Sequence, residues 1–150
     1  MVLSADRVTW DSIQVGDELP QVVKQETQET INEYWRLAQD RRKNWKSLHM
    51  DEQYARERTI FGATVNMGVA TVGYCAEMLQ RAFPLKSIFA PGARLEMKAT
   101  NPIHAGDTVT LSGRVAAKRE ESGQRLVDVE FTGVNQLGVT VAAGRATLVL

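Results

Sequence analysis

Histidine and cysteine, the residue types that most readily exchange protons or attack a substrate near neutral pH, are scarce in this sequence, which has two histidines and one cysteine. His49 follows a basic stretch and is expected on a loop, where an imidazole can exchange a proton near neutral pH. His104 lies beside a turn signal and is expected to be exposed. Cys75 lies inside an apolar stretch and is expected to fill space. By itself, His49 is also consistent with a loop histidine that makes only a structural hydrogen bond.

The spacing of the other polar residues indicates no metal or phosphate site. Histidine, cysteine and carboxylate residues do not cluster at the spacing of metal ligands, and no glycine-rich loop precedes a helix. A run of basic residues is most simply a solvated surface. It comprises Arg41, Arg42, Lys43 and Lys46.

Residues 62–83 form the apolar stretch around which the rest of the chain is expected to be arranged. Apolar side chains recur at helical spacing on both of its sides, which predicts a helix buried in a core rather than lying on a surface. Polar residues interrupt the run that a membrane span would need. On this helix, Gly73 is expected to permit close packing by a neighbouring strand.

Local signals predict the remaining elements. Thr27 is a good N-cap for one helix, with Glu29 in its first turn, and Asp51 is a candidate N-cap for a second, short helix. Alternating apolar and polar residues predict strands near 21–25, 95–99, 109–115, 127–132 and 139–150. Because polar turns join the last four segments, they are expected to form an antiparallel meander. Asn101-Pro102 is one of these turn signals.

The order of these elements predicts an α+β domain in which one antiparallel sheet curls around a helix at 64–82. A length of 150 residues suits a single domain with its own core. Eighteen basic and eighteen acidic residues cancel, which removes the electrostatic argument for nucleic acid or an anionic membrane as partner. With no secretory signal visible at the start of the chain, a cytoplasmic protein is expected.

Five stretches, taken together and in order, resemble the MaoC-like dehydratase family, which includes (R)-specific enoyl-CoA hydratases. They are VGDELP at 15–20, LHMDEQYA at 48–55, GATVNMG at 62–68, NPIHAGDTVTLSGRV at 101–115 and VNQLGVTVAAGRATLVL at 134–150. The resemblance implies a hot-dog fold, usually paired into a dimer. It also implies a lyase that adds water reversibly to an enoyl thioester.

The resemblance also implies the site residues. In the family, an aspartate and a histidine hold the water that adds across the double bond, since the reaction needs both a base and an acid. The histidine carries over as His49. The amide that faces the thioester oxygen carries over as that of Gly68, in the first turns of the central helix, where free N–H groups favour an anion. Gly68 is also consistent with a glycine that lets a strand pack closely.

Two alignments place the aspartate differently. Counting forward from the preceding helix gives Asp40, which is the catalytic candidate, whereas counting back from His49 gives Asn44. The two positions are about one helical turn apart. Asn44 could hold a water by hydrogen bonding, but asparagine cannot act as a base at neutral pH. The resemblance also makes Arg41, Arg42 and Lys43 candidate contacts for coenzyme A phosphates.

The sequence therefore predicts an acyl-thioester hydratase or dehydratase without a separate cofactor, since coenzyme A would be part of the substrate. Two alternatives remain open: a catalytically altered hot-dog subunit that binds acyl thioesters or pairs with an active homologue, and an acyl-CoA thioesterase. In each case we expect a homodimer or larger homo-oligomer, or pairing with a second hot-dog chain, because unpaired sheet edges favour association. We expect no nucleic-acid or membrane partner.

Overall fold

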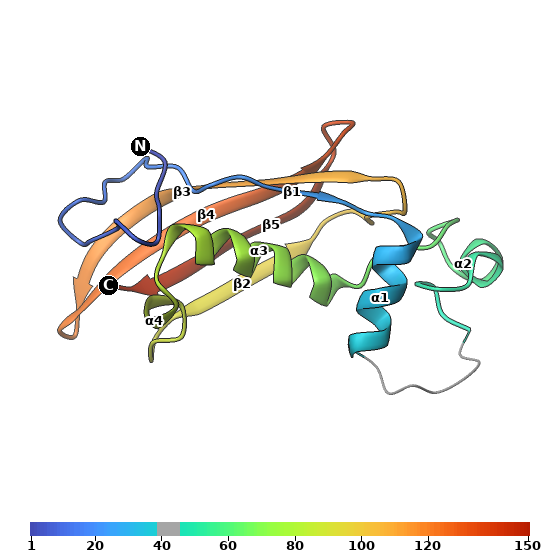
Figure 1. The fold of residues 1–150 in the computed structure, drawn as a ribbon, viewed down its shortest axis with the longest axis horizontal. Coiled ribbons are helices and arrows are strands. Elements are labelled where there is room, and N and C mark those ends of the chain that lie inside the picture. The colour runs from blue at the N-terminus through green and yellow to red at the C-terminus, as the bar shows by residue number, and fades with distance from the viewer. Residues whose placement is uncertain (39–45) are drawn as a thin grey trace.

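One five-stranded sheet and one long helix dominate the chain (Figure 1). A computed structural model describes residues 1–38 and 46–150. The elements within these ranges, in chain order, are β1 (Val22–Gln25), α1 (Gln28–Ala38), α2 (Glu52–Arg58), α3 (Gly68–Ala82), α4 (Leu85–Ile88), β2 (Arg94–Ala99), β3 (Thr108–Glu121), β4 (Gln124–Asn135) and β5 (Thr140–Val149).

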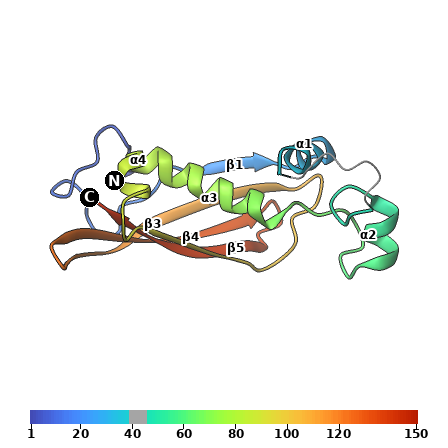
Figure 2. The same ribbon diagram turned by 90° about the horizontal axis from the view of Figure 1, so that it is seen from below.

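Helix α3 lies along one face of the sheet, as both views of the ribbon show (Figures 1 and 2). Helices α1 and α2 lie together beyond the N-terminal end of α3, while both chain termini lie near its other end. The predicted α+β architecture, with an antiparallel sheet around one long central helix, is confirmed. The N-terminal end of α3 is therefore where these separate helices lie close together.

The strand order is β1-β3-β4-β5-β2, and every neighbouring pair is antiparallel. The predicted meander is confirmed for β3, β4 and β5. It is wrong for β2, which pairs with β5 at the far edge instead of with β3. The connection at 100–107 crosses the N-terminal end of α3, where the backbone N–H of Asn66 donates to the oxygen of Ile103 at 2.8 Å. This crossing connection closes the end of the molecule that holds His49.

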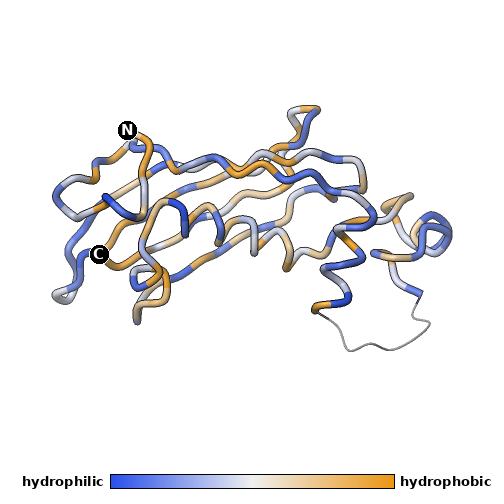
Figure 3. Tube along the Cα trace, viewed as in Figure 1, coloured by the Kyte–Doolittle hydropathy of each residue, from blue (hydrophilic) through white to orange (hydrophobic). Residues whose placement is uncertain are grey.

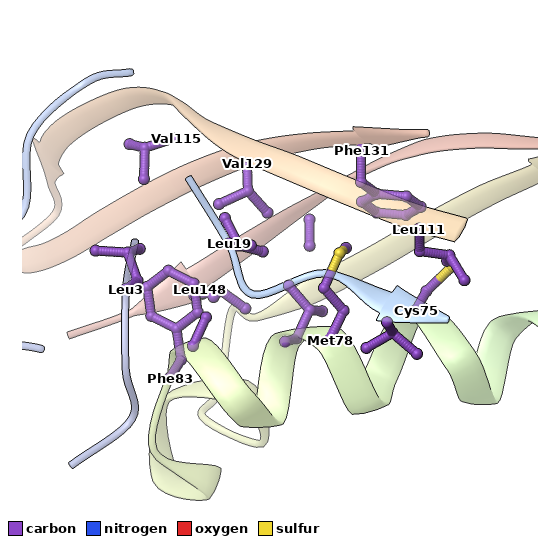
Figure 4. Packing of buried hydrophobic residues seen from close by; sticks show 14 of the residues in the cluster. Leu3, Leu19, Cys75, Met78, Phe83, Leu111, Val115, Val129, Phe131 and Leu148 are labelled. Atoms are coloured by element: carbon purple, nitrogen blue, oxygen red, sulfur yellow. The ribbon is translucent and has the colours of Figure 1, made fainter. Parts of the chain in front are cut away.

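The apolar face of α3 packs into the sheet, with Cys75 and Met78 pointing toward it (Figure 4). The prediction that the helix begins at residue 64 is wrong, since it begins at Gly68. The prediction that both of its sides are buried is also wrong, because it buries one face only: Val69 is 54% and Val72 is 37% exposed. The hydropathy of the trace shows apolar segments along both the helix and the sheet (Figure 3). None of the helices within residues 1–38 and 46–150 has the length and apolarity needed to cross a membrane.

Local capping explains where the helices near the site begin. Thr27 and Thr30 exchange backbone-to-hydroxyl hydrogen bonds of 2.9 and 3.2 Å at the start of α1, which confirms the predicted N-cap. Asp51 accepts from the backbone N–H of Tyr54 at 2.9 Å and starts α2, also as predicted. These caps hold the helix ends on either side of the residues around His49.

Cys75 is fully buried on α3, and burial raises the pKa of its thiol to about 11. A thiol with so high a pKa is almost entirely protonated near neutral pH, and only the thiolate is a good nucleophile. The prediction that Cys75 fills space in the core is consistent with this position.

Strands β3, β4 and β5 place Gly113, Phe131 and Gly144 side by side across the sheet. A Cβ on Gly144 would lie 2.5 Å from Cζ of Phe131 and closer still to the backbone oxygen of Glu96. Gly144→Ala is therefore expected to destabilise the protein by about 1–3 kcal/mol or more, because the backbone oxygen cannot move aside. The measurement is the free energy of unfolding in denaturant.

Gly73→Ala is the matched control for that substitution. Gly73 lies on the exposed side of α3, and a Cβ there would meet nothing within 4 Å, so the prediction that this glycine permits close packing is wrong. Alanine is the better helix former by about 0.5–1 kcal/mol, so this variant should be slightly more stable than the parent. Equal stability of the two alanine variants would contradict the packing account of Gly144.

Candidate functional site

A pocket of about 380 Å³ lies at the N-terminal end of α3. Four separate parts of the chain line it: Leu48 and His49, residues between Phe61 and Thr71, the end of β2 with the start of the crossing connection (99–103), and Val141 of β5. Most of the lining is apolar, and the polar lining residues are His49, Asn66, Thr71, Thr100 and Asn101. An apolar pocket with a few polar groups is the usual form of a small-molecule site.

His49 is half-buried in this pocket, and its ring is held on two sides. Its Nδ1 lies 2.8 Å from the backbone oxygen of Val65, and the ring of Trp35 in α1 is 5.4 Å away between centroids. A carbonyl oxygen can only accept, so Nδ1 carries the hydrogen and donates it. In the neutral ring, Nε2 then holds the lone pair and can accept a proton. His49 therefore has the tautomer that a general base needs.

Gly68 lines the same pocket and is the first residue of α3. The first N–H groups of a helix have no acceptor within it, and the N-cap residue Met67 supplies no side-chain acceptor here. The N–H of Gly68 has no acceptor among residues 1–38 and 46–150. A Cβ at Gly68 would meet nothing within 4 Å, so close packing does not explain this glycine. What it offers is a free N–H at the positive end of a helix.

The segment that carries Val65 is held between both histidines. His104 lies 3.0 Å through Nδ1 from the backbone oxygen of Thr64 and donates to it, just as His49 donates to that of Val65. The prediction that His104 is exposed is wrong: it is half-buried and forms an isolated bridge with Val65. Both contacts fix the stretch that leads into α3, and so they fix the position of Gly68.

Several predicted site residues lie outside the described residues. These are the aspartate candidate Asp40, the alternative Asn44, and the predicted phosphate contacts Arg41, Arg42 and Lys43. Their predicted roles stay predictions. Among the described residues, no three histidine, cysteine or carboxylate side chains lie close enough together to hold a metal ion.

The structure brings two unpredicted groups to the site. Asn101 and Pro102, which in sequence are only a turn signal, line the pocket because the connection after β2 crosses the end of α3. Gln28, in the first turn of α1, donates from Nε2 to the backbone oxygen of His49 at 2.9 Å. The sequence did not indicate that either group lies at the site, since both contacts join residues far apart along the chain.

A family model described as the FAS1-like dehydratase domain region matches residues 13–143. The chain therefore belongs to this dehydratase family. No curated protein matches it.

Solved structures show the same fold. One is a MaoC-like dehydratase from Rhodospirillum rubrum, 22% identical, with 93% of this chain and 94% of that chain covered and a TM-score of 0.74. Another is the (R)-hydratase from A. caviae involved in PHA biosynthesis, which is 20% identical, with 91% of this chain and 96% of that chain covered and a TM-score of 0.72. A third is a chain of the ChsH1–ChsH2 complex from Mycobacterium tuberculosis, which is 19% identical, with 91% of this chain and 98% of that chain covered and a TM-score of 0.69. The hot-dog fold and the MaoC-like resemblance predicted from the sequence are confirmed.

Proposed function

We propose that this protein adds water reversibly to the double bond of an enoyl thioester, acting in the cytoplasm on a coenzyme A or carrier-protein substrate. In this reaction a base takes a proton from water, and the resulting hydroxide bonds to C3. The electron pair of the double bond moves through C2 onto the thioester oxygen, and an acid then returns a proton to C2. The reaction needs no cofactor, because coenzyme A is part of the substrate.

His49 supplies the proton acceptor in this proposal. Its Nδ1–H is held by the carbonyl oxygen of Val65, so the lone pair of Nε2 is available to the water. After the transfer, the same contact stabilises the imidazolium, since a carbonyl oxygen accepts more strongly from a charged donor. The protonated ring can then act as the acid for the reverse reaction.

Gly68 supplies the charge stabilisation. The thioester oxygen becomes negative as hydroxide adds to C3, and a free N–H at a helix N-terminus favours negative charge there. The apolar part of the pocket, with Leu48, Phe61 and Ile103, offers a surface for an acyl chain. The proposal is carried by one observation: His49, in the tautomer of a base, lines the same apolar pocket as the free N–H end of α3.

The direct test is the loss of the ultraviolet absorbance of the conjugated enoyl thioester. Purified protein should consume at least one member of a panel of enoyl-CoA substrates that differ in chain length, and the 3-hydroxyacyl product should regenerate the enoyl. Release of free thiol without any need for a double bond would identify a thioesterase instead. No turnover of any member would contradict the hydratase proposal and favour a subunit that binds thioesters or works beside an active homologue.

Asp40 is proposed as the second acid–base group, and paired substitutions test it against Asn44. Asp40→Asn is expected to lower kcat by about 10²-fold or more, because an amide cannot transfer the proton that C2 must receive. Asn44→Asp is the companion variant and should leave turnover close to the parent value. A large increase in kcat for Asn44→Asp, with Asp40→Asn unchanged, would place the family's aspartate position at residue 44. The pH dependence of kcat is recorded for all three proteins.

The protein is also proposed to associate, with itself or with a second hot-dog chain. Strands β1 and β2 are the edges of the sheet, and β2 is largely exposed along its length. Exposed edges readily pair with another chain, and the exposed valines of α3, Val69 and Val72, add apolar surface. Light scattering coupled to size-exclusion chromatography should give at least twice the mass of one chain, whereas a monomer at micromolar concentration would contradict the proposal.

A further inference from the structure

Gln28 holds the backbone of His49 from the first turn of α1. Its Nε2 donates to the backbone oxygen of His49 at 2.9 Å and to Oδ1 of Asn32, also at 2.9 Å. Its Oε1 accepts from the hydroxyl of Thr64 at 2.5 Å. This half-buried amide therefore uses both of its N–H donors and its oxygen.

The orientation of this amide follows from its partners. The backbone oxygen of His49 can only accept a hydrogen bond, so the nitrogen of Gln28 must face it. The oxygen of Gln28 must then face Thr64, whose hydroxyl can donate. A reversed amide would place two oxygens against each other at His49, which costs free energy where the groups are partly buried.

These contacts form a closed circuit around His49. The ring of His49 donates through Nδ1 to the oxygen of Val65, and Val65 is bonded to Thr64, whose hydroxyl donates to Gln28. Gln28 closes the circuit by donating to the backbone oxygen of His49. The same glutamine thus holds the backbone of the histidine and the segment that orients its ring.

The start of α1 is itself firmly attached. Beside the Thr27 cap, the buried carboxylate of Glu26 accepts hydrogen bonds from the hydroxyls of Thr30 and of Tyr74 on α3. Burial, and then the bond to Glu26, raise the pKa of Tyr74 above its ordinary value, so the phenol stays protonated and donates. Gln28 therefore projects from a helix end that is fixed to the central helix.

We propose that Gln28 is a positioning residue for His49. Through the circuit it keeps the ring in the Nδ1–H tautomer, with the Nε2 lone pair available to the reacting water. The inference rests on the proposed function of His49, and it adds a residue that never contacts the substrate. Since small displacements of a catalytic group lower the rate steeply, loss of the circuit should affect the chemical step more than binding.

Gln28→Met tests this, because methionine is similar in length but makes none of the three hydrogen bonds. The expected result is a kcat about 10- to 100-fold lower with KM changed far less. Tyr74→Phe is the matched control: it removes a contact that secures the same helix end and does not touch His49. This control should lower the unfolding midpoint and keep its kcat near the parent value. An equal loss of kcat in both variants would mean that Gln28 acts only through stability and would overturn the proposal.

Two substitutions of Thr64 test the hydrogen bond that its hydroxyl donates to Gln28. Thr64→Val removes the donor to Gln28 and should reproduce the Gln28→Met phenotype, whereas Thr64→Ser keeps a hydroxyl and should retain much more of the kcat. Both valine and serine are close to threonine in size, so a difference between them reports the hydrogen bond. Equal kcat in these two variants would overturn the circuit.

Nitrogen NMR of the imidazole rings gives a readout that does not depend on turnover. The chain has two histidines, so the spectrum of a His49→Asn variant assigns the remaining ring to His104. The parent should show neutral His49 as the Nδ1–H tautomer, and Gln28→Met should show a mixture of tautomers. Such a mixture in a protein without hydratase activity would support the positioning and overturn only the proposed function. An unchanged tautomer in Gln28→Met would overturn the positioning even if the parent is an active hydratase.

Discussion

Replacing His49 with asparagine is expected to lower kcat for enoyl-thioester hydration by about 10²- to 10⁴-fold, the usual contribution of a general base. The asparagine amide nitrogen takes a place similar to that of Nδ1 and can still donate to the oxygen of Val65. It has no counterpart of Nε2. The substitution therefore removes the proton acceptor and keeps the structural hydrogen bond of 2.8 Å that the ring makes.

The unfolding midpoint of this variant serves as its control. It should stay close to that of the parent, because the contact between residue 49 and the segment before α3 persists. His49→Ala removes both functions and should lose stability as well as turnover. If His49→Asn hydrates enoyl thioesters at the parent rate, His49 is a structural loop histidine, which is the alternative that the sequence left open.

Replacing Gly68 with proline is expected to lower kcat by about 10²- to 10³-fold, the usual cost of losing one oxyanion donor. Proline removes the N–H and is well tolerated at the first position of a helix, which Gly68 occupies in α3. The preceding residue must be extended, and Met67 already has φ −77° and ψ 133°. The backbone at this position is thus compatible with proline, whose Cδ takes the place of the N–H hydrogen that faces the pocket.

Gly68→Ala separates the N–H from the small size of glycine. Alanine keeps the donor, and its Cβ would meet nothing within 4 Å, so its kcat should far exceed that of the proline variant. Circular dichroism should show the same helix content in all three proteins. Similar turnover in the proline and alanine variants would contradict the role of the amide and leave His49 as the remaining catalytic group at this end of α3.

Much of the secondary structure could be predicted because its signals are local. The alternation of Val127, Val129 and Phe131 predicts the strand that becomes β4. Thr27 and Asp51 predict helix starts because the acceptors that cap a helix lie within three residues of the donors. The predicted start of α3 was less accurate, since apolar residues at 62–67 continue the apolar pattern although the backbone there is not helical.

The site could be predicted only in part, and the reason is again the range of the interactions. The resemblance of LHMDEQYA and GATVNMG to a known family pointed to His49 and Gly68, and both residues line one pocket. Gln28 gave no signal, because a glutamine in the first turn of a helix is ordinary until a distant carbonyl lies against it. The exposed valines of α3 were also missed, since periodicity shows which side chains share a face and not what covers that face.

The sequence alone determined the α+β class, the central helix and the histidine that is the candidate base. The tertiary structure decided that β2 pairs with β5, so that the connection at 100–107 crosses the end of α3 and completes the pocket. It also decided the tautomer of His49, through a carbonyl that follows it by sixteen residues. Periodicity and caps are set by neighbours along the chain, whereas strand order and ring orientation depend on which distant segments pack together.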